Sequence, residues 1–511
     1  MRIVLCSVIL SVASSALGTW ISHSQLKTSA SNDLLHCLKN AGLDPVVEGN
    51  PDYATDVAPF NLRFHWKPAA LVYPSDTKGV AAAVKCGADN SVKVNARSGG
   101  HSYAAFALGG EDGHLTVSLD HFRHLSLDGD KVTFGPGNRL GDIALYLWNH
   151  GQRAMAHGTC PDIGSGGHAG QGGWGFSSRL WGLFADQIQS LEIVTADGSI
   201  LNASHLENVD LFWAATGAAA SFGIITSFTA VTHPAMDSIA FSYTFANYGA
   251  EEASKGLQAW QAFTNDPVNK LDNAVGIQIL VNASPGGAPK KIVFAISGVY
   301  YGADEATVNS AFAPLLRQLG TPTDVSLHKQ DWITSVLHLA GMNSADQLNS
   351  TLTPDIHNTF YATSTFVSEI EPMNRAASDA LFRYFYGPGA NTAVEWFVIF
   401  HLHGGGDSVV STTYADYNAF DARDALYSIQ YYGTIPASVS DKDGIAFIQG
   451  MKKAVENNQP LTRFKEYVNY IDSTYSAEES HKRYYPTHRV ILKVLKEKYD
   501  PNRVISFPQD F

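Results

Sequence analysis

The chain has 511 residues, of which 45% are hydrophobic and 11% aromatic, and its formal net charge is −13 at pH 7. This length exceeds what one compact core uses, so we expect two or three domains, and the apolar content excludes a disordered chain. An acidic balance without a long block of Lys and Arg argues against nucleic acid and membrane as partners. We therefore expect an acidic, soluble protein that acts on a small molecule, and we further expect a monomer.

The first 20 residues are typical of a secretory signal peptide. Arg2 supplies the positive end, the apolar run from Ile3 to Ala13 is too short to span a bilayer, and Ala16-Leu17-Gly18 suits cleavage. We expect removal of residues 1–18 and a secreted mature protein, with a buried N-terminal helix as the alternative. Two Asn-x-Ser/Thr sites predict glycosylation of an extracellular surface: Asn202 and Asn349.

The first half of the chain alternates short helices and strands. Helical spacing predicts helices over 75–90 and 140–151, and the strand at 92–100 runs into glycines. The stretches "HLTVSLD" and "DKVTFGPG" predict further strands, and 190–204 reads as a hairpin turning at Asp197-Gly198. This order predicts an α+β domain that ends near Pro234.

After Pro234 the glycine-rich loops thin out and longer apolar strands appear, such as "AVGIQILVNAS", "KKIVFAISGVYYG" and "TAVEWFVIFHLHGG". Helical segments lie between them, which predicts a second α+β domain with a large, mainly antiparallel sheet. The stretch 485–501 predicts a final helix, with Pro486 near its start and Pro501 after its end.

Four glycine-rich loops precede residue 225, and they favour a large cofactor that carries phosphate, because glycines let backbone N–H groups approach a ligand. The run Gly170–Gly175 matches G-x-G-x-x-G, but no apolar strand precedes it, which argues against a Rossmann site. A zinc site is a further alternative, with a single thiolate among its candidate ligands. Those ligands would be His157, Cys160 and His168.

The cysteine count raises a question about Cys160. Once Cys6 leaves with the signal peptide, Cys37, Cys86 and Cys160 remain. An odd number means either one free thiol or one partner that is not cysteine. A Cys37–Cys86 bond would close a loop and stabilise the fold by about 4 kcal/mol. Cys160 would then be the remaining cysteine, in a segment too rich in glycine to be ordinary core. A buried, unreacted thiol is the alternative.

Two motifs together, "RSGGHSYAAFALGGEDGHL" and "AHGTCPDIGSGGHAGQGGWG", resemble those of the FAD-linked oxidases of the berberine bridge enzyme-like group, most of all its fungal oligosaccharide oxidases. The similarity runs from Cys37 to Val231 and resumes at "YVNYIDSTY" and "YDPNRVISFPQ". The resemblance implies a two-domain α+β fold. An FAD-binding domain would span 27–234, a substrate domain with a large antiparallel sheet 235–460, and a segment returning to the FAD domain 461–511.

In that family the glycine-flanked histidine and the cysteine each form a covalent bond to the flavin. The resemblance therefore implies bicovalent FAD on His101 and Cys160 and a Cys37–Cys86 disulfide. A covalent bond suits a secreted protein, which cannot replace a lost cofactor by mass action. The remaining residues that the resemblance places at the cofactor are Ser98, Gly99, Gly100, Ser102, Gly158, Gly164, Gly167 and His168.

The substrate half resembles a family site built on Y-x-N-Y, here Tyr467-Val-Asn469-Tyr470. The second tyrosine takes the hydroxyl proton in the oligosaccharide oxidases, so Tyr470 is the candidate base. A tyrosine with an ordinary pKa of about 10 must be activated to work near neutral pH. Without the motif, a core tyrosine with a satisfied hydroxyl would be an equally good interpretation.

The sequence departs from the sugar oxidases around this tyrosine. His401 stands where they carry an aspartate; a carboxylate would accept the phenolic proton, whereas an imidazolium would favour tyrosinate. Ile399 replaces a glutamine, Gln278 a glutamate and Phe397 a tryptophan, so the expected pocket is less acidic and more apolar. Tyr103 and Tyr467 complete the residues that the resemblance places at the substrate.

Two further differences concern the flavin. The family's arginine and glycine run is here Thr216-Gly217-Ala-Ala-Ala-Ser221, whose small residues still allow close approach. Ile163 stands at a position that influences oxygen access in this family, where a valine accompanies oxidase activity. We therefore expect either O2 or another electron acceptor to reoxidise the flavin.

We therefore predict a secreted FAD-linked oxidoreductase that oxidises an alcohol group of a secondary metabolite, such as a polyketide alcohol. We expect no resident metal. The alternatives are a sugar oxidase that forms a lactone and a catalytically silent flavoprotein.

Overall fold

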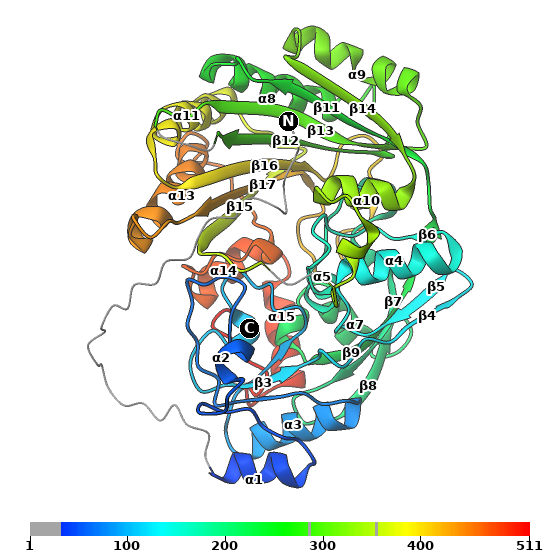
Figure 1. Ribbon diagram of the computed structural model, residues 1–511, viewed down its shortest axis with the longest axis vertical. Helices are drawn as coiled ribbons and strands as arrows, with labels where there is room; N and C mark the ends of the chain where they lie inside the picture. The colour runs from blue at the N-terminus through cyan, green and yellow to red at the C-terminus, as the bar shows by residue number, and fades with distance from the viewer. Residues whose placement is uncertain (1–31, 285–287, 353–355) are drawn as a thin grey trace.

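The computed structural model describes residues 32–284, 288–352 and 356–511 (Figure 1). The predicted signal peptide, residues 1–18, lies outside them. Within these ranges no helix is both long enough and apolar enough to cross a membrane.

A small parallel sheet begins the fold. Its order is β1 (Ala70–Val72), β3 (Leu115–Ser118) and β2 (Val94–Arg97), and nearly all its side chains are buried. The helices α1 (Asn32–Asn40) and α3 (Thr77–Asp89) pack beside it. The predicted helix at 75–90 and the strand at 92–100 are thus confirmed, and the strand ends where the glycines of the first flavin motif begin.

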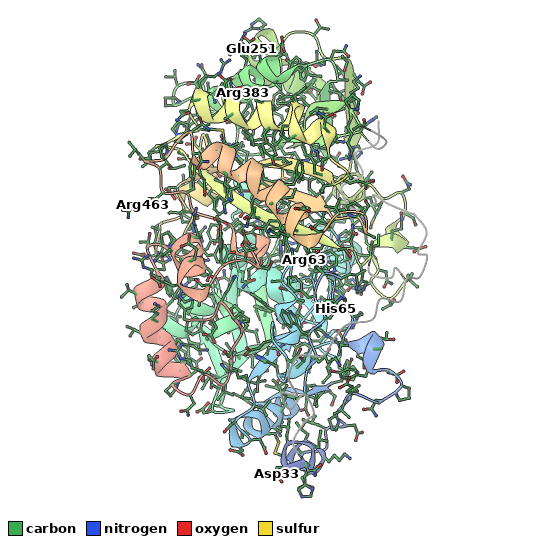
Figure 2. All side chains as sticks on the ribbon, turned by 90° about the vertical axis from the view of Figure 1, so that its left-hand side faces the viewer. Asp33, Arg63, His65, Glu251, Arg383 and Arg463 are labelled. Carbon is green, nitrogen blue, oxygen red and sulfur yellow. A yellow bond between two sulfur atoms is a disulfide. The ribbon has the colours of Figure 1, made fainter. Side chains whose placement is uncertain are left out.

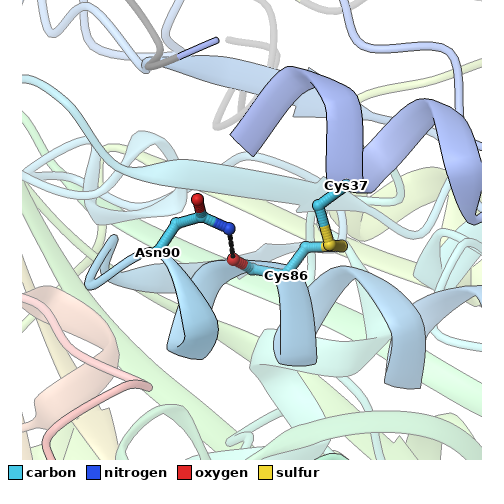
Figure 3. Close-up of a disulfide and its surroundings, with 3 residues drawn as sticks. All are labelled: Cys37, Cys86 and Asn90. Carbon is cyan, nitrogen blue, oxygen red and sulfur yellow. Dashed lines mark hydrogen bonds between the residues drawn. A yellow bond between two sulfur atoms is a disulfide. The ribbon is translucent and has the colours of Figure 1, made fainter. Parts of the chain in front are cut away.

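Helices α1 and α3 are joined by a disulfide between Cys37 and Cys86, with their Cα atoms 5.7 Å apart (Figure 3). The side chain of Asn90 closes the end of α3 by donating to the carbonyl oxygen of Cys86 at 2.8 Å. This pairing confirms the disulfide that the family resemblance implied.

A five-stranded antiparallel sheet follows. Its order is β4 (Leu125–Asp128), β5 (Lys131–Phe134), β9 (Ile224–Val231), β7 (Ile188–Val194) and β8 (Ile200–Ser204). The predicted hairpin at 190–204 is confirmed, because β7 and β8 pair from Val194 opposite Ile200 outward. The predicted helix at 140–151 is α4 (Leu140–Gly151), which buries Leu140, Ile143 and Leu147.

The second large sheet has seven antiparallel strands, as the sequence predicted. It occupies the upper half of Figure 1. In spatial order the strands are β14 (Asp324–Gln330), β11 (Ser238–Phe245), β13 (Ile292–Tyr301), β12 (Val275–Ala283), β16 (Glu395–Leu402), β17 (Ala425–Thr434) and β15 (Phe360–Ser368).

Alternation along the central strands gives this sheet two different faces. On β16, Trp396, Val398, Phe400 and Leu402 belong to the main hydrophobic core. Helices α8 (Ala250–Thr264), α9 (Glu305–Leu319), α11 (Arg375–Tyr386) and α13 (Asp441–Glu456) contribute side chains to that core or pack against it. The intervening residues of β16, among them His401, face the other way, and Figure 1 shows the glycine-rich half of the molecule below the sheet.

Buried arginine and polar contacts tie the two halves together. Arg179 on α6 (Ser178–Trp181) is 1% exposed and donates to the carbonyl oxygens of Leu271, Asp272, Val275, Gly404 and Gly405. Arg63 approaches Asp441 of α13 at 3.5 Å and donates to Ser473 at 3.0 Å, and Figure 2 shows it at this junction.

The C-terminal segment returns to the first half of the fold. Helix α14 (Ala477–Tyr484) leads to α15 (Arg489–Tyr499), which is shorter than the predicted 485–501 because Pro486 and its neighbours form a turn before it. Beyond α15, Ile505 forms a parallel bridge with Val94 of β2. The ammonium of Lys496, 0% exposed, donates to the carbonyl oxygen of Ser221 at 2.8 Å.

Candidate active site

The first of the two predicted flavin motifs is a glycine loop at the end of β2. Ser98 donates to the carbonyl oxygen of Pro136 at 2.6 Å and accepts from the backbone N–H of Gly166 at 3.1 Å. Gly100 has φ +75°, in the left-handed region that favours glycine. The Ser102 hydroxyl accepts from the N–H of Phe106 at 3.1 Å. The loop is therefore fixed by its own polar groups.

The second motif lies directly against the first. A Cβ added to Gly99 would lie 2.4 Å from the amide nitrogen of Gly164, and one added to Gly164 would lie 2.2 Å from that of Gly99. The two loops thus touch backbone to backbone, which only glycine permits. At Gly167 an added Cβ would meet nothing within 4 Å, so a ligand could approach the backbone there.

His101 and the segment after Cys160 come together from these two loops. The imidazole of His101 stacks on Phe60, with ring centroids 4.2 Å apart, and its Nε2 lies 3.8 Å from Asp162 Oδ2. Asp162 is two residues beyond Cys160, so the side chains of both predicted attachment motifs line one region. The glycine loops that carry His101 and Cys160 could bring backbone N–H groups close to a cofactor that carries phosphate.

The histidine in the second motif has a structural role. Its Nε2 accepts from the backbone N–H of Gly158 at 3.0 Å, and burial lowers the pKa of His168 to about 3, so the ring is neutral. The described residues contain no group of three or more His, Cys, Asp and Glu side chains that could hold a metal ion. The zinc alternative therefore has no support in this region.

The other glycine runs serve packing between protein segments. A Cβ on Gly175 would lie 1.7 Å from the carbonyl oxygen of His157, and one on Gly217 would lie 2.3 Å from the amide nitrogen of Phe420. Gly217 therefore lies against Ala419 and Phe420, in the segment between β16 and β17. These glycines fit between chain segments, and their presence alone does not mark a ligand.

Tyr470 and His401 meet at the boundary between the two halves. Tyr470 ends the short helix η6 (Val468–Tyr470), and its hydroxyl lies 3.3 Å from Nε2 of His401 on β16. Its ring stacks on that of Tyr103, with centroids 5.9 Å apart and planes 7° from parallel. The Tyr103 hydroxyl accepts from Nε2 of Gln430 at 3.0 Å.

Burial sets the charge state of this pair. It lowers the pKa of His401 to about 3, against a smaller opposing hydrogen bond from Gln430. It also raises the pKa of Tyr470 well above the ordinary range, with Tyr103 and Tyr467 adding to the effect. The resting pair is therefore a phenol beside a neutral imidazole, and the imidazolium considered from the sequence is not its resting form.

The predicted substrate residues lie on the same face of the sheet. Gln278 pairs with His401 across β12 and β16, and its Oε1 is buried without a hydrogen-bond partner among the described residues. Phe397 stacks on Tyr432, with ring centroids 4.7 Å apart. Ile399 lies between Phe397 and His401 on β16 and is 0% exposed.

The hydroxyl group of Tyr467 is buried and hydrogen-bonded within the protein. Its side chain is 3% exposed, and its oxygen accepts from the backbone N–H groups of Gly173 and Trp174 and from Nδ2 of Asn469, each at 3.0 Å. The hydroxyl oxygen is therefore fully occupied by protein donors.

Sequence reasoning missed two residues of this site, Trp174 and Gln430. The indole of Trp174 lies 4.2 Å from the His401 ring, centroid to centroid. Gln430 is a lone amide in the buried strand "ALYSIQYYGT", and a polar residue among apolar ones is a signal that could have found it. Trp174 had no such signal, because it lies in a glycine run far from His401 in sequence.

Three other predicted positions stay predictions. Ile163 packs against the core of the first half, and its backbone N–H donates to the carbonyl oxygen of Cys160 at 3.4 Å. Asn202 is exposed on β8, whereas Asn349 is half-buried and its side-chain oxygen accepts from Thr351.

Comparison with known proteins agrees with these features. A family profile described as an FAD binding domain matches residues 68–204. The chain is 31% identical to a chitooligosaccharide oxidase of Gibberella zeae over 96% of both chains, and 33% identical to a xylooligosaccharide oxidase of Thermothelomyces thermophilus over 98% of both. A reticuline oxidase of Eschscholzia californica is a more distant relative, at 25% identity.

Solved structures give the same result. A chitooligosaccharide oxidase superposes with a TM-score of 0.86 at 31% identity, covering 94% of this chain and 99% of the other. A glucooligosaccharide oxidase from Acremonium strictum, whose FAD is described as 6-S-cysteinyl and 8α-N1-histidyl, gives 0.86 at 30% identity, covering 94% and 99%.

The two-domain fold and the glycine cradle define an FAD-linked oxidoreductase. The chain belongs to the berberine bridge enzyme-like family of FAD-linked oxidases, and it is similar over nearly its whole length to the family's fungal oligosaccharide oxidases. This confirms the family and the fold predicted from the two motifs.

Proposed function

We propose that this protein is a secreted oxidase that converts the reducing-end hydroxyl group of a sugar to the lactone. The observation that carries the proposal is the Tyr470–His401 contact of 3.3 Å, beside the loops of both flavin motifs. The relatives' oligosaccharide activities favour a sugar over the secondary metabolite that the apolar substitutions suggested.

We further propose that FAD is held through both His101 and Cys160. The touching glycine loops that carry these residues support this, as does the doubly linked flavin described for the glucooligosaccharide oxidase. When bound, FAD supplies the acceptor that takes a hydride from the carbinol carbon and passes two electrons to O2, giving hydrogen peroxide.

The chain's own residues handle the proton. The substrate hydroxyl passes its proton to the oxygen of Tyr470, whose phenolic proton moves to Nε2 of His401. The neutral imidazole has a ring nitrogen 3.3 Å from the phenol that can take this proton, although burial makes its cation costly. A phenol alone would have to release the proton to water against a raised pKa. The substrate thus loses a hydride from carbon and a proton from oxygen, and the loss of both leaves the carbonyl.

Intact-mass measurement of the mature protein tests the cofactor. The expected mass is that of the polypeptide and its glycans plus one FAD, retained in acid. Cys160→Ala and His101→Ala should each keep one link, and the double variant should release the pigment. A wild-type mass without flavin would contradict the proposal.

A panel of glucose, cellobiose, xylobiose, chitobiose and maltose, followed by peroxide release and by anaerobic flavin bleaching, tests the substrate. Turnover of one of these sugars is expected. Bleaching by none of them would contradict the sugar assignment, and peroxide-free bleaching would point to a different acceptor.

A second candidate is an aromatic or polyketide-like alcohol. The stacked rings of Phe397, Tyr432 and Phe360 favour it, with Tyr432 lying 4.7 Å from each of the other two. Aryl alcohols in the same panel distinguish it. A protein that no compound reduces would be the silent flavoprotein.

A further inference from the structure

Trp174 lies against the proposed proton acceptor without taking part in proton transfer. Its indole centroid is 4.2 Å from that of His401, and its Nε1–H donates to the carbonyl oxygen of Leu402 at 3.0 Å. The side chain is 5% exposed. A hydrogen bond to the residue next to His401 therefore fixes the indole beside the imidazole.

The surroundings of His401 offer little to stabilise a positive charge. The titratable groups around it are Tyr470, His403 and, beyond them, Tyr103 and Tyr467. No carboxylate forms an ion pair with it within the described ranges. A buried cation without a counter-charge is costly, and the ring of a tryptophan within about 6 Å is the aromatic group that best attracts it.

The segment from Tyr467 to Tyr470 contacts both Trp174 and His401. The hydroxyl oxygen of Tyr467 accepts hydrogen bonds from the backbone N–H groups of Gly173 and Trp174, and Tyr467 lies three residues before Tyr470. Gly172 and Gly173 have φ +100° and +81°, which only glycine adopts readily and which aim these N–H groups at the phenol. Tyr470, His401, Trp174 and Tyr467 thus form a closed ring of contacts across the two halves.

We propose that Trp174 is a positioning residue that stabilises the imidazolium formed when His401 takes the phenolic proton of Tyr470, and that Tyr467 holds Trp174 in place. This inference rests on the proposed function. Only protons move within the ring of contacts, from the substrate oxygen to Tyr470 and from Tyr470 to Nε2 of His401. Tyr467 then binds its donors within the protein and makes no contact with substrate through its oxygen.

The proposal is tested by measuring kcat and KM with the sugar of the panel that is turned over fastest. Two variants are compared, Trp174→Phe and Trp174→Leu, each made in the wild-type protein and in His401→Asp. Both lose the indole N–H, so their difference isolates the aromatic face. We expect kcat to fall about tenfold in Leu and less in Phe, with KM within about twofold. In His401→Asp the difference between Phe and Leu should disappear, because a carboxylate that takes a proton becomes neutral.

Trp260→Phe is the matched control, since Trp260 is 0% exposed on the far side of the sheet and contacts Tyr427. It should leave kcat unchanged. Equal losses for Leu and Phe, or the same difference in both backgrounds, would overturn the inference. Unchanged turnover in Tyr470→Phe or His401→Ala would instead contradict the proposed function.

If the Trp174 variants lose flavin or melt early, Tyr467→Phe replaces them. It should lower kcat in wild type by more than in His401→Asp, again with KM little changed. An equal loss in both backgrounds would show that Tyr467 acts on stability alone and would also overturn the inference.

Discussion

His401 is the residue on which the proposed proton transfer depends. It occupies a central strand of the seven-stranded sheet, faces the flavin loops and is 4% exposed. Burial at this depth lowers the pKa of His401 to about 3, so the imidazole is neutral near pH 7. The site therefore combines two neutral groups, a phenol and an imidazole, where a carboxylate would have brought a negative charge.

At this scale we predict that His401→Ala lowers kcat about 100-fold at neutral pH and moves the pH optimum upward. Without the imidazole, the phenolic proton of Tyr470 must leave to solvent, and its pKa is raised, so activity returns only as the pH rises. The pH dependence of kcat measures this. An optimum that stays in place would show that His401 does not accept the proton.

The two touching glycine loops are the elements that would shape the proposed cofactor site. The loop after β2 and the loop before α5 (Ser165–Gly170) meet at Gly99 and Gly164, and neither backbone leaves room for a side chain. The first loop follows β2 directly, and the second is joined to the start of α4 by a bridge between Gly164 and Arg139.

We predict that Gly99→Ala lowers the fraction of protein carrying covalent flavin by at least about tenfold, because the loops must separate to admit a methyl group. The ratio of flavin absorbance to protein absorbance after acid precipitation gives this fraction. Gly256→Ala on α8 is the control, since its nearest new contact would be 3.3 Å away. Full flavin content in Gly99→Ala would mean that the contact is not needed.

The whole molecule is held by links between distant parts of the chain. The Cys37–Cys86 disulfide joins the first two long helices, Arg179 connects the halves, and Ile505 after α15 forms an isolated bridge with β2. We predict that Cys37→Ser with Cys86→Ser lowers the free energy of unfolding by about 4 kcal/mol, through a less constrained unfolded chain. Denaturant unfolding of the double variant measures it, and an unchanged midpoint would contradict it.

Stability should also fall in acid. His168 and His401 are buried with pKa values lowered to about 3, below the ordinary value of 6.5. Between these limits the unfolded chain binds protons that the folded chain does not, so stability decreases as pH falls from 6.5 toward 3, by about 1.4 kcal/mol per pH unit for each histidine. Thermal unfolding at pH 7 and pH 5 measures this. His168→Gln should reduce the dependence.

The sequence by itself determined the antiparallel second sheet and the cofactor motifs, and the resemblance of those motifs implied the family and the disulfide partners. These follow from local patterns: strand alternation, glycine clusters, and two motifs that are specific in combination. The tertiary structure alone decided that His401 is neutral, that the oxygen of Tyr467 is occupied by backbone donors, and that Trp174 lies on His401. Burial and contact between segments more than 200 residues apart control these properties, because desolvation depends on what packs around a group and leaves no pattern in the neighbouring sequence.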